Sequence, residues 1–341
     1  MNNVVKKRLD ELDIRALFLV WGFPLGAHRS QLMAQLLGMR VEHAYLTRKQ
    51  GRLYALLKYP VQALQTLIIL VRQRPRVVFV QDPPIFATLM VYLWGLVTGT
   101  KYVIDSHTDA LLAPWWEWVR PMHRFLARRA ITNLVTNAQL QQIVAAWGAD
   151  AFILQDVPTT FSNRRQVHLD DAAFNIVFVS TVSYDEPIFQ VLEAAKNLPD
   201  VRFYITGAYD ARAPHIVQNA PANVHFTGYL PDEEFYGLLE AAQTVMCLTT
   251  ENYTMQSGAS EALWLGKPII TSDWPLLREY FNQGTIHVDN TAGSIGQAVL
   301  TMRGNLPAFQ ADILRLQQVR RQEWWSGVSS LIHLIQKAVQ Q

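Results

Sequence analysis

Short apolar runs alternate along the chain with longer segments in which apolar positions recur at helical spacing. Apolar runs rich in β-branched residues are typical of buried strands, and the longer periodic segments are typical of amphipathic helices. The pattern therefore predicts an α/β fold of parallel sheets covered by helices. The predicted strands are 16–22, 41–47, 76–82, 101–107, 131–137, 174–180, 201–207, 223–229, 244–250, 267–273 and 285–289. The predicted helices are 28–38, 53–73, 85–98, 117–129, 138–147, 187–197, 232–242, 259–265, 275–282 and 293–303.

A polar stretch without periodicity, residues 158–172, interrupts this alternation near mid-chain. We interpret it as a linker between two doubly wound, Rossmann-like domains at 1–165 and 170–310. Residues 311–341 are expected to form one or two amphipathic helices. Ligands of open parallel sheets bind beyond the carboxyl ends of the strands, so we expect both domains to present their functional loops to a cleft between them.

Composition narrows the function classes. The chain has 341 residues, is 50% hydrophobic and contains a single cysteine, Cys247. These values exclude a mainly disordered chain, a disulfide framework and a cysteine-based zinc module. Residues 1–169 carry 20 Lys+Arg and 10 Asp+Glu, whereas 170–341 carry 10 and 18. The resulting net charges of +10 and −8 favour an anionic surface or substrate for the first half.

The chain's start lacks the apolar core of a secretory signal, so we expect a cytoplasmic location. The most apolar run, 83–98, is shorter than the ~20 residues that span a bilayer. We expect it to be a buried helix, with a helix that dips into the membrane as the alternative. No Gly-x-Gly-x-x-Gly follows the first strand and no P-loop is present, so no dinucleotide cofactor is expected. No nucleic-acid partner is expected either.

The most specific segment is 249–273, TTENYTMQSGASEALWLGKPIITSD. It reads as a strand, an irregular loop, a helix and a further strand. Ser257, Gly258 and Ser260 come at the expected helix start, where free N–H groups and the helix dipole favour a phosphate. We place Glu261 in the first turn, where its carboxylate can accept hydrogen bonds from a ribose diol. The alternative is that Ser260 and Glu261 are ordinary helix-start residues.

This segment resembles the donor-binding signature of GT-B glycosyltransferases, above all the retaining family 4 and the family 1-type group. The resemblance implies two Rossmann-like domains facing a cleft, with the C-terminal helices returning to the first domain. It also implies that Glu261 grips the ribose of a nucleotide sugar. The family's other glutamate, which faces the donor sugar, corresponds to Tyr253, and Glu251 lies two residues away.

Two further stretches resemble the same family. The loop 178–187, FVSTVSYDEP, is similar to the loop that approaches the donor phosphates, which implies phosphate contacts from Ser180, Thr181 and Ser183. Residues 224–242 resemble the stretch whose turn, here Gly228 and Tyr229, lies beside the nucleobase. The family's basic residue near the first of these loops is absent from this chain.

Residues 80–107 resemble one branch, the chitobiosyldiphosphodolichol β-mannosyltransferases, which are inverting and act at membranes. Asp105, His107 and Asp109 come at the carboxyl end of the fourth predicted strand. An inverting transfer needs a base within ~3 Å of the acceptor hydroxyl, and we expect one of these three residues to supply it. In retaining relatives the corresponding histidine contacts the donor sugar. The alternative for His107 is a histidine that is satisfied structurally.

The loop 21–30 follows the first strand, and its glycines, Gly22 and Gly26, allow close backbone approach to a ligand. The resemblance implies that this loop borders the acceptor and the donor diphosphate. We therefore predict contacts from His28 and Arg29, with Arg29 replacing the absent basic residue. A plain helix-entry turn is the alternative.

Residues 113–130 combine tryptophans with arginines. This combination favours a membrane interface with anionic lipid. The alternative is an amphipathic helix that packs on its own sheet. The predicted membrane-facing residues are Trp115, Trp116, Trp118, Arg124 and Arg128.

We expect a metal-independent hexosyltransferase that uses a nucleotide-diphosphate sugar as donor and has no cofactor. The expected acceptor is a hydroxyl of a lipid-linked sugar or a polysaccharide, at the inner face of the membrane. No Asp-x-Asp motif ends a strand, which is consistent with the absence of a metal. The alternatives are an epimerase or phosphorylase on the same fold, or a non-catalytic subunit that binds a nucleotide sugar.

Overall fold

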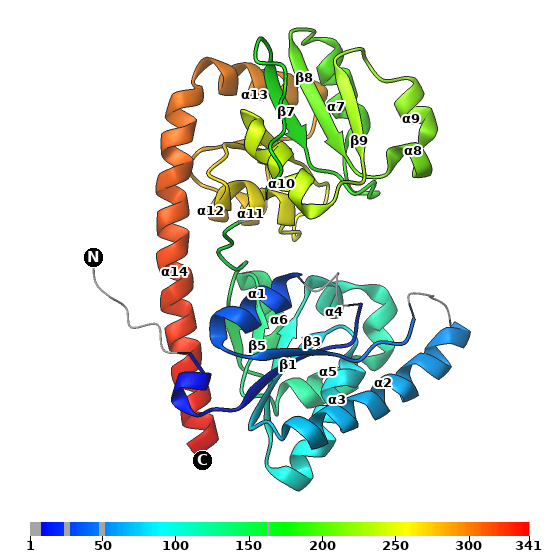
Figure 1. Ribbon diagram of the computed structural model, residues 1–341, viewed down its shortest axis with the longest axis vertical. Coiled ribbons are helices and arrows are strands. Elements are labelled where there is room, and N and C mark those ends of the chain that lie inside the picture. Colours follow the sequence, from blue (N-terminus) through cyan, green and yellow to red (C-terminus); the bar gives the residue numbers. More distant parts are fainter. Residues whose placement is uncertain (1–7, 24–27, 48–51, 162–163, 341) are drawn as a thin grey trace. The chain divides into compact units, whose positions relative to one another are not determined.

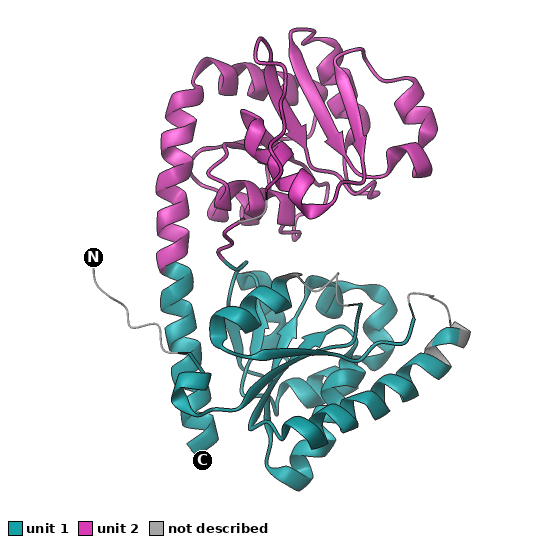
Figure 2. Cartoon of the chain, viewed as in Figure 1, with its two compact units in different colours: residues 1–157, 323–341 teal, residues 158–322 magenta. Residues whose placement is uncertain are grey.

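The computed structural model describes residues 8–23, 28–47, 52–161 and 164–340. The chain divides into two compact units (Figure 2). Unit 1 comprises residues 1–157 and 323–341, and unit 2 comprises residues 158–322. The first segment of unit 1 thus ends at Val157, before the boundary at residue 165 that we expected from the sequence.

Unit 1 contains a six-stranded parallel sheet with the strand order β2-β1-β3-β4-β5-β6 (Figure 1). Its strands are β1 Ala16–Val20, β2 Arg40–His43, β3 Val77–Asp82, β4 Lys101–Ser106, β5 Asn133–Val135 and β6 Ala151–Ile153. Its helices are η1 Asp10–Leu12, α1 His28–Leu37, α2 Arg52–Gln73, α3 Ile85–Thr98, α4 Thr108–Leu112, η3 Pro114–Val119, α5 Arg120–Ala127 and α6 Ala138–Ala146.

Both faces of this sheet are buried, because alternate residues of each strand enter different cores. In β1, Phe18 and Val20 lie in one cluster, whereas Leu17 and Leu19 lie in the other. The continuous apolar runs that predicted strands are therefore explained by a sheet covered on two sides. The carboxyl ends of β3 and β4 carry Asp82 and Asp105 among these apolar residues.

Unit 2 has a second six-stranded parallel sheet, with the order β12-β11-β10-β7-β8-β9. Its strands are β7 Phe174–Phe178, β8 Val201–Thr206, β9 Val224–Gly228, β10 Thr244–Cys247, β11 Ile269–Ser272 and β12 Thr285–Val288. Its helices are α7 Ile188–Lys196, α8 Tyr209–Arg212, α9 Pro214–Gln218, α10 Asp232–Ala241, α11 Ser257–Trp264, α12 Pro275–Tyr280 and α13 Ala292–Gly304.

The C-terminal residues form one helix, α14 Leu306–Gln340, with residues in both units (Figures 1 and 2). Ile313 and Leu316 belong to the core of unit 2. Further along the same helix, Trp324, Leu331 and Ile335 pack into the core of unit 1 with residues of β1 and β3.

The predicted α/β class is confirmed, and the differences concern short elements. The sequence pattern missed η1, α4, β6, α8 and α9, whose three to five residues are too few to show a periodicity. The expected helix at 117–129 is divided into η3 and α5. The expected linker has no helix or strand in its described residues, but Phe161 packs on Tyr236 with ring centroids 4.2 Å apart. Those residues therefore belong to the packed structure of unit 2.

Candidate functional site

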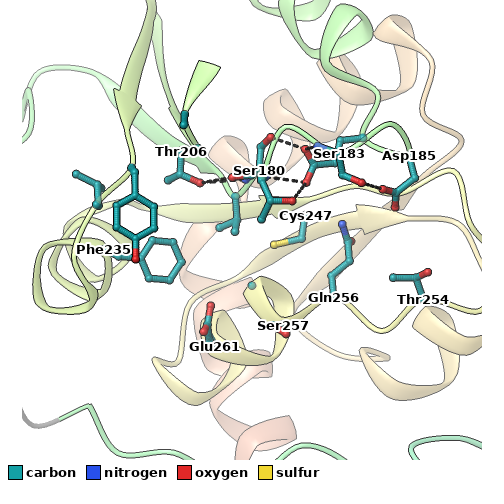
Figure 3. Close-up of a pocket in the computed structure, with 18 of the residues that line it drawn as sticks. Ser180, Ser183, Asp185, Thr206, Phe235, Cys247, Thr254, Gln256, Ser257 and Glu261 are labelled. Carbon is teal, nitrogen blue, oxygen red and sulfur yellow. Dashed lines mark hydrogen bonds between the residues drawn. The ribbon is translucent and has the colours of Figure 1, made fainter. Parts of the chain in front are cut away.

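A cavity of about 670 Å³ opens at the carboxyl ends of β7, β8 and β10 (Figure 3). Val179 and Ser180 line it directly after β7, Thr206 and Gly207 at the end of β8, and Cys247 at the end of β10. Helix α11 contributes Ser257, Gly258 and Glu261 to the wall. Ligands of parallel α/β sheets bind at this edge, so unit 2 has one well-formed candidate for a ligand site here.

Gly258 lets α11 approach the sheet closely. A Cβ at this position would lie 2.6 Å from Cγ1 of Val179 and 3.0 Å from Sγ of Cys247. The first N–H groups of a helix have no intrahelical acceptors, and they carry the positive end of the helix dipole. The close approach therefore brings an anion-binding helix end to the rim of β7 and β10.

Glu261 is the fifth residue of α11 and thus starts its second turn, not the first turn that we expected. Its Oε1 lies 3.5 Å from the hydroxyl of Tyr236, which also lines the cavity. Burial, followed by the nearby Glu261 carboxylate, raises the pKa of Tyr236. The tyrosine is therefore neutral, and its hydroxyl donates to Glu261 at the cavity wall.

The loop after β7 is arranged differently from the prediction. The carboxylate of Glu186 accepts from the N–H of Thr181 at 2.9 Å and from the N–H of Ser183 at 3.0 Å. It also accepts from the hydroxyls of Thr181 at 3.1 Å and Ser180 at 2.5 Å. The hydroxyl of Ser183 donates to Asp185. We predicted that these hydroxyls donate to phosphate oxygens, but they already donate to side chains of the same loop, as Figure 3 shows in part.

The charges around the cavity are mostly negative. Four lining residues are acidic: Asp185, Glu186, Asp232 and Glu261. Among the described residues that line the cavity, Arg212 is the one basic side chain. Its Nη1 donates to the carbonyl of Thr181 at 3.2 Å, which places the guanidinium beside the loop after β7. Arg212 was missed in the sequence, although α8 directly follows β8 at the same sheet edge.

Other predicted donor residues fall in two groups. Tyr229 is exposed and lines the cavity, next to Gly228, whose φ of +70° suits a glycine in this turn. Ser260 is buried and, like Glu251 and Tyr253, does not line the cavity, because α11 turns Ser260 towards the core. Thr254, Met255 and Gln256 of the same loop line it instead. No signal in the sequence distinguished these neighbours.

The carboxyl end of the first sheet holds a charged cluster. Oδ2 of Asp105 lies 3.4 Å from Nε2 of His107, and Oδ1 lies 3.6 Å from Nη2 of Arg29. Burial raises the pKa of Asp105, but Arg29 and His107 outweigh it, so the pKa lies below its ordinary value. Asp105 is therefore an ionised, buried partner for the half-exposed ring of His107. Asp109 is exposed on α4.

Arg29 is engaged by several acceptors of unit 1. Its Nη1 donates to Oδ1 of Asp156 and to the carbonyl of Gln155, both at 3.0 Å, and its Nη2 donates to the carbonyl of Leu154 at 2.8 Å. Together with Asp105, these acceptors engage the guanidinium within unit 1, and the contact of Arg29 with a diphosphate stays a prediction. Gly22 follows shortly after β1, and its carbonyl oxygen lies 3.3 Å from Nδ1 of His43. Gly26 and the side chain of His28 lie outside the described residues.

A second buried acid–histidine pair adjoins this cluster and was not foreseen. Nε2 of His123 lies 2.6 Å from Oδ2 of Asp82, and both side chains are buried. The carbonyl of Asp82 accepts from the N–H of His107 at 2.9 Å. The pair thus connects α5 to the strand ends that position His107.

The predicted membrane-facing residues lie on η3 and α5. Trp115 and Trp118 are exposed, whereas Trp116 is partly buried against Ile85 and Val119. Arg124 lies over the ring of Trp147, with 5.9 Å to its centroid, and Nε of Arg128 donates to the carbonyl of Trp147. In the described part of the chain, no helix is both long enough and apolar enough to cross a bilayer.

Comparison with known families places one model on each half of the chain. Residues 6–152 match a glycosyl transferase 4-like domain, and residues 160–301 match the family described as glycosyl transferases group 1. Together the two matches cover both sheets, including the cavity in unit 2. No curated protein matches the chain.

Solved structures similar to this chain share its fold at low sequence identity. Sucrose-phosphate synthase from Thermosynechococcus elongatus has a TM-score of 0.71 and 13% identity, over 95% of this chain and 98% of that chain. Anabaena HepE, solved with UDP and glucose, has a TM-score of 0.67 and 13% identity, over 93% and 100%. A putative UDP-N-acetylglucosamine 2-epimerase from Listeria monocytogenes has a TM-score of 0.60 and 12% identity, over 87% and 90%.

Proposed function

We propose that this chain, which belongs to the GT-B glycosyltransferases of the group 1 and 4-like type, moves a hexose-type sugar from a nucleotide diphosphate to a hydroxyl acceptor. The cavity in unit 2 carries the proposal, because Glu261 and the start of α11 adjoin it at the carboxyl ends of β7, β8 and β10. Solved neighbours that contain UDP support a nucleotide-sugar donor.

In this proposal the nucleoside is held by the Glu261 carboxylate and by the turn that carries Tyr229. Glu261 accepts from the ribose hydroxyls, and the turn at Gly228 and Tyr229 flanks the base. The hydroxyl of Tyr236, 3.5 Å from Glu261, keeps that carboxylate oriented at the wall. A carboxylate that accepts from two vicinal hydroxyls recognises ribose specifically, because both bonds are charge-assisted.

The diphosphate is stabilised by the start of α11 and by Arg212. Since Glu186 already engages the loop donors, the free N–H groups at Ser257 and Gly258 and the guanidinium of Arg212 are the positive groups left at this cavity. Such donors stabilise the negative charge that develops on the leaving diphosphate, without a metal ion. Arg212 thus takes the role that we predicted for Arg29.

For the transfer itself we assign the base to His107. The acceptor oxygen attacks the anomeric carbon, the bond from that carbon to the diphosphate oxygen breaks, and the acceptor proton passes to the imidazole. Asp105 faces Nε2 and stabilises the imidazolium, so Nδ1 is the atom that takes the proton. The acceptor is a lipid-linked sugar or a polysaccharide, and the basic unit 1 meets it at the inner face of the membrane.

Binding of nucleotides tests the donor site. We expect UDP, or another of GDP, ADP and dTDP, to raise the thermal midpoint of the wild-type chain. Glu261→Ala weakens both the diphosphate and its nucleoside, since the ribose contact is common to them. Arg212→Ala weakens binding of the diphosphate by about ten- to a hundredfold but leaves binding of the nucleoside unchanged, because a charge-assisted contact contributes about 1.5–3 kcal/mol. The control is Arg303→Ala, because Arg303 forms an exposed ion pair with Asp200 and does not line the cavity.

The same set of variants separates transfer from binding. His107→Ala keeps the affinity for the diphosphate and lowers the transfer rate by ~100-fold, the usual contribution of a general base. Interconversion of a nucleotide sugar without any acceptor would instead identify an epimerase. Binding without turnover of any donor would favour a non-catalytic subunit.

A further inference from the structure

Helix α2 buries two polar side chains beside its apolar Leu70. Gln62 and Thr66 are fully buried, and Nε2 of Gln62 donates to the carbonyl of Ala44 at 2.8 Å. The hydroxyl of Thr66 accepts from Nε1 of Trp21 at 2.8 Å and donates to the carbonyl of Gln62 at 2.8 Å. These buried polar groups are fixed by hydrogen bonds, which determines the side that α2 turns to the sheet.

The opposite side of α2 is apolar and exposed. Leu57, Leu64, Ile68 and Val71 are between 42% and 69% exposed. Their spacing of seven, four and three residues keeps them on one stripe of the helix, which extends ~20 Å at 1.5 Å per residue. A surface helix in water normally exposes a polar side, so this apolar stripe indicates a partner that covers it.

The neighbouring elements continue the same surface. Helix α3 packs beside α2 and exposes Leu93, Leu96 and Val97 at positions of one face, with Val97 85% exposed. The rings of Phe86 in α3 and Trp118 in η3 have centroids 5.9 Å apart, and those of Tyr92 in α3 and Phe125 in α5 have centroids 5.5 Å apart. We call the exposed residues the outer apolar face: Leu57, Leu64, Ile68, Val71, Leu93, Leu96, Val97, Trp115, Trp118 and Phe125.

This result revises the expectation for residues 83–98. Helix α3 buries Ile85, Ala87, Thr88 and Val91 against its sheet, but its last turn is exposed. No described helix is suited to span a bilayer, so α2 and α3 contact any membrane from its surface. Figure 1 shows α2, α3 and α5 grouped on one part of unit 1.

Charge distinguishes the possible occupants of this face. No Asp or Glu occurs between Glu42 and Asp82, a stretch that includes Lys58, Arg72 and Arg74. Helix α3 has no charged residue, and α5 adds Arg124 with Arg129, whose guanidinium lies 3.6 Å from the ring of Phe125. A second copy of the chain would bring like charges together, whereas anionic headgroups complement these lysine and arginine side chains.

We propose that the outer apolar face is a docking surface for an anionic lipid bilayer, with α2 and α3 lying in the plane of the interface. The proposal extends the proposed function, because a docked unit 1 meets a lipid-linked acceptor at the membrane. It does not depend on any transfer step, since lipid alone is the ligand.

Vesicle binding tests this surface without nucleotide or acceptor. We expect the wild-type chain to bind vesicles of phosphatidylcholine and phosphatidylglycerol in equal parts, and more weakly those of phosphatidylcholine alone or in high salt. Leu64→Ser combined with Leu96→Ser lowers the partition coefficient by about tenfold or more, because two large apolar side chains no longer leave water. The control pair, Phe189→Ser with Leu300→Ser, alters two exposed apolar positions of unit 2 and leaves vesicle binding unchanged.

Three results would overturn the proposal: a wild-type chain that does not bind these vesicles, a Leu64/Leu96 variant that binds as well as wild type, or a wild-type dimer that the variant dissociates. Thermal midpoints of all variants report whether they fold. Nucleotide binding by the same samples reports on the donor site in unit 2, so failure of this proposal is distinguishable from failure of the proposed function.

Discussion

Two charged side chains that look like ligand-binding residues, Arg29 and Glu186, are engaged by their own units. Arg29 meets Asp156, 127 positions away in the sequence, as well as Asp105 and two carbonyls. Glu186 accepts hydrogen bonds from N–H and hydroxyl groups that could also donate to a phosphate oxygen. An internal partner is always present at high effective concentration, so these groups serve the architecture of the site's surroundings.

Arg29→Ala should therefore act on stability. Removing Arg29 takes away one charged partner of the buried Asp105 and leaves His107 beside it, and we expect a loss of about 3 kcal/mol in the free energy of unfolding. Asp105 has a lowered pKa in the folded chain, so its contribution is present above the ordinary pKa of about 4 and is lost as the pH falls through the folded value. The difference between wild type and variant should shrink in that acidic range.

Urea unfolding at neutral and acidic pH measures both effects. Arg8→Ala is the matched control, because its pair with Asp10 is exposed and should contribute less than about 1 kcal/mol. If Arg29→Ala unfolded like wild type but had lost its affinity for diphosphates, the phosphate role predicted from the sequence would be correct after all.

At the scale of elements, the position of α11 depends on one missing side chain. Gly258 is the residue at which the helix comes within van der Waals distance of Val179 and Cys247. The glycine was visible in the sequence as a helix-start residue. Its packing role was not, because the residues that it contacts come from β7 and β10.

Gly258→Ala should move the start of α11 away from the sheet. A contact of 2.6 Å cannot persist, and overpacking of this kind costs about 1–3 kcal/mol. We expect a lower free energy of unfolding together with weaker nucleotide binding, measured by urea unfolding and thermal shift.

Gly296→Ala in α13 makes the same chemical change where nothing lies within 4 Å of the new Cβ. It should stabilise the chain by about 0.5–1 kcal/mol, because alanine is the better helix former. Equal effects of the two substitutions would show that close packing at Gly258 is not what positions α11.

At the scale of the whole molecule, the charge asymmetry remains when the charges are counted over the two observed units. Unit 1 carries 19 Lys+Arg and 11 Asp+Glu, and unit 2 carries 11 and 17. Unit 1 therefore has a net charge of +8, and unit 2 has a net charge of −6. A basic unit with an exposed apolar face and an acidic unit with a ligand cavity are consistent with different tasks for the two.

Helix α14 is the element on which both cores depend. Leu331 is fully buried in unit 1, whereas Leu314 of the same helix is half-exposed in unit 2. Leu331→Ala should cost about 3 kcal/mol, within the range for a buried leucine, and Leu314→Ala less than about 1 kcal/mol. Hydrogen exchange should locate the first loss in β1 and β3, whose residues share the cluster of Leu331. Equal losses in both variants would contradict the observed packing of α14.

Local periodicity was sufficient to predict two α/β domains, most strands and helices, and the segment that contains Glu261, because burial on both faces of a sheet leaves its mark on consecutive residues. It was also sufficient to bring Asp105 and His107 to one strand end. The tertiary structure decided which polar groups satisfy each other. Glu186 accepts hydrogen bonds from the loop after β7, and Asp156 and Asp105 pair with the guanidinium of Arg29. It also decided that α2 turns Gln62 and Thr66 inwards and Leu57 and Leu64 outwards. These outcomes depend on partners from distant segments, and hydrogen bonding and burial act through space and not along the chain.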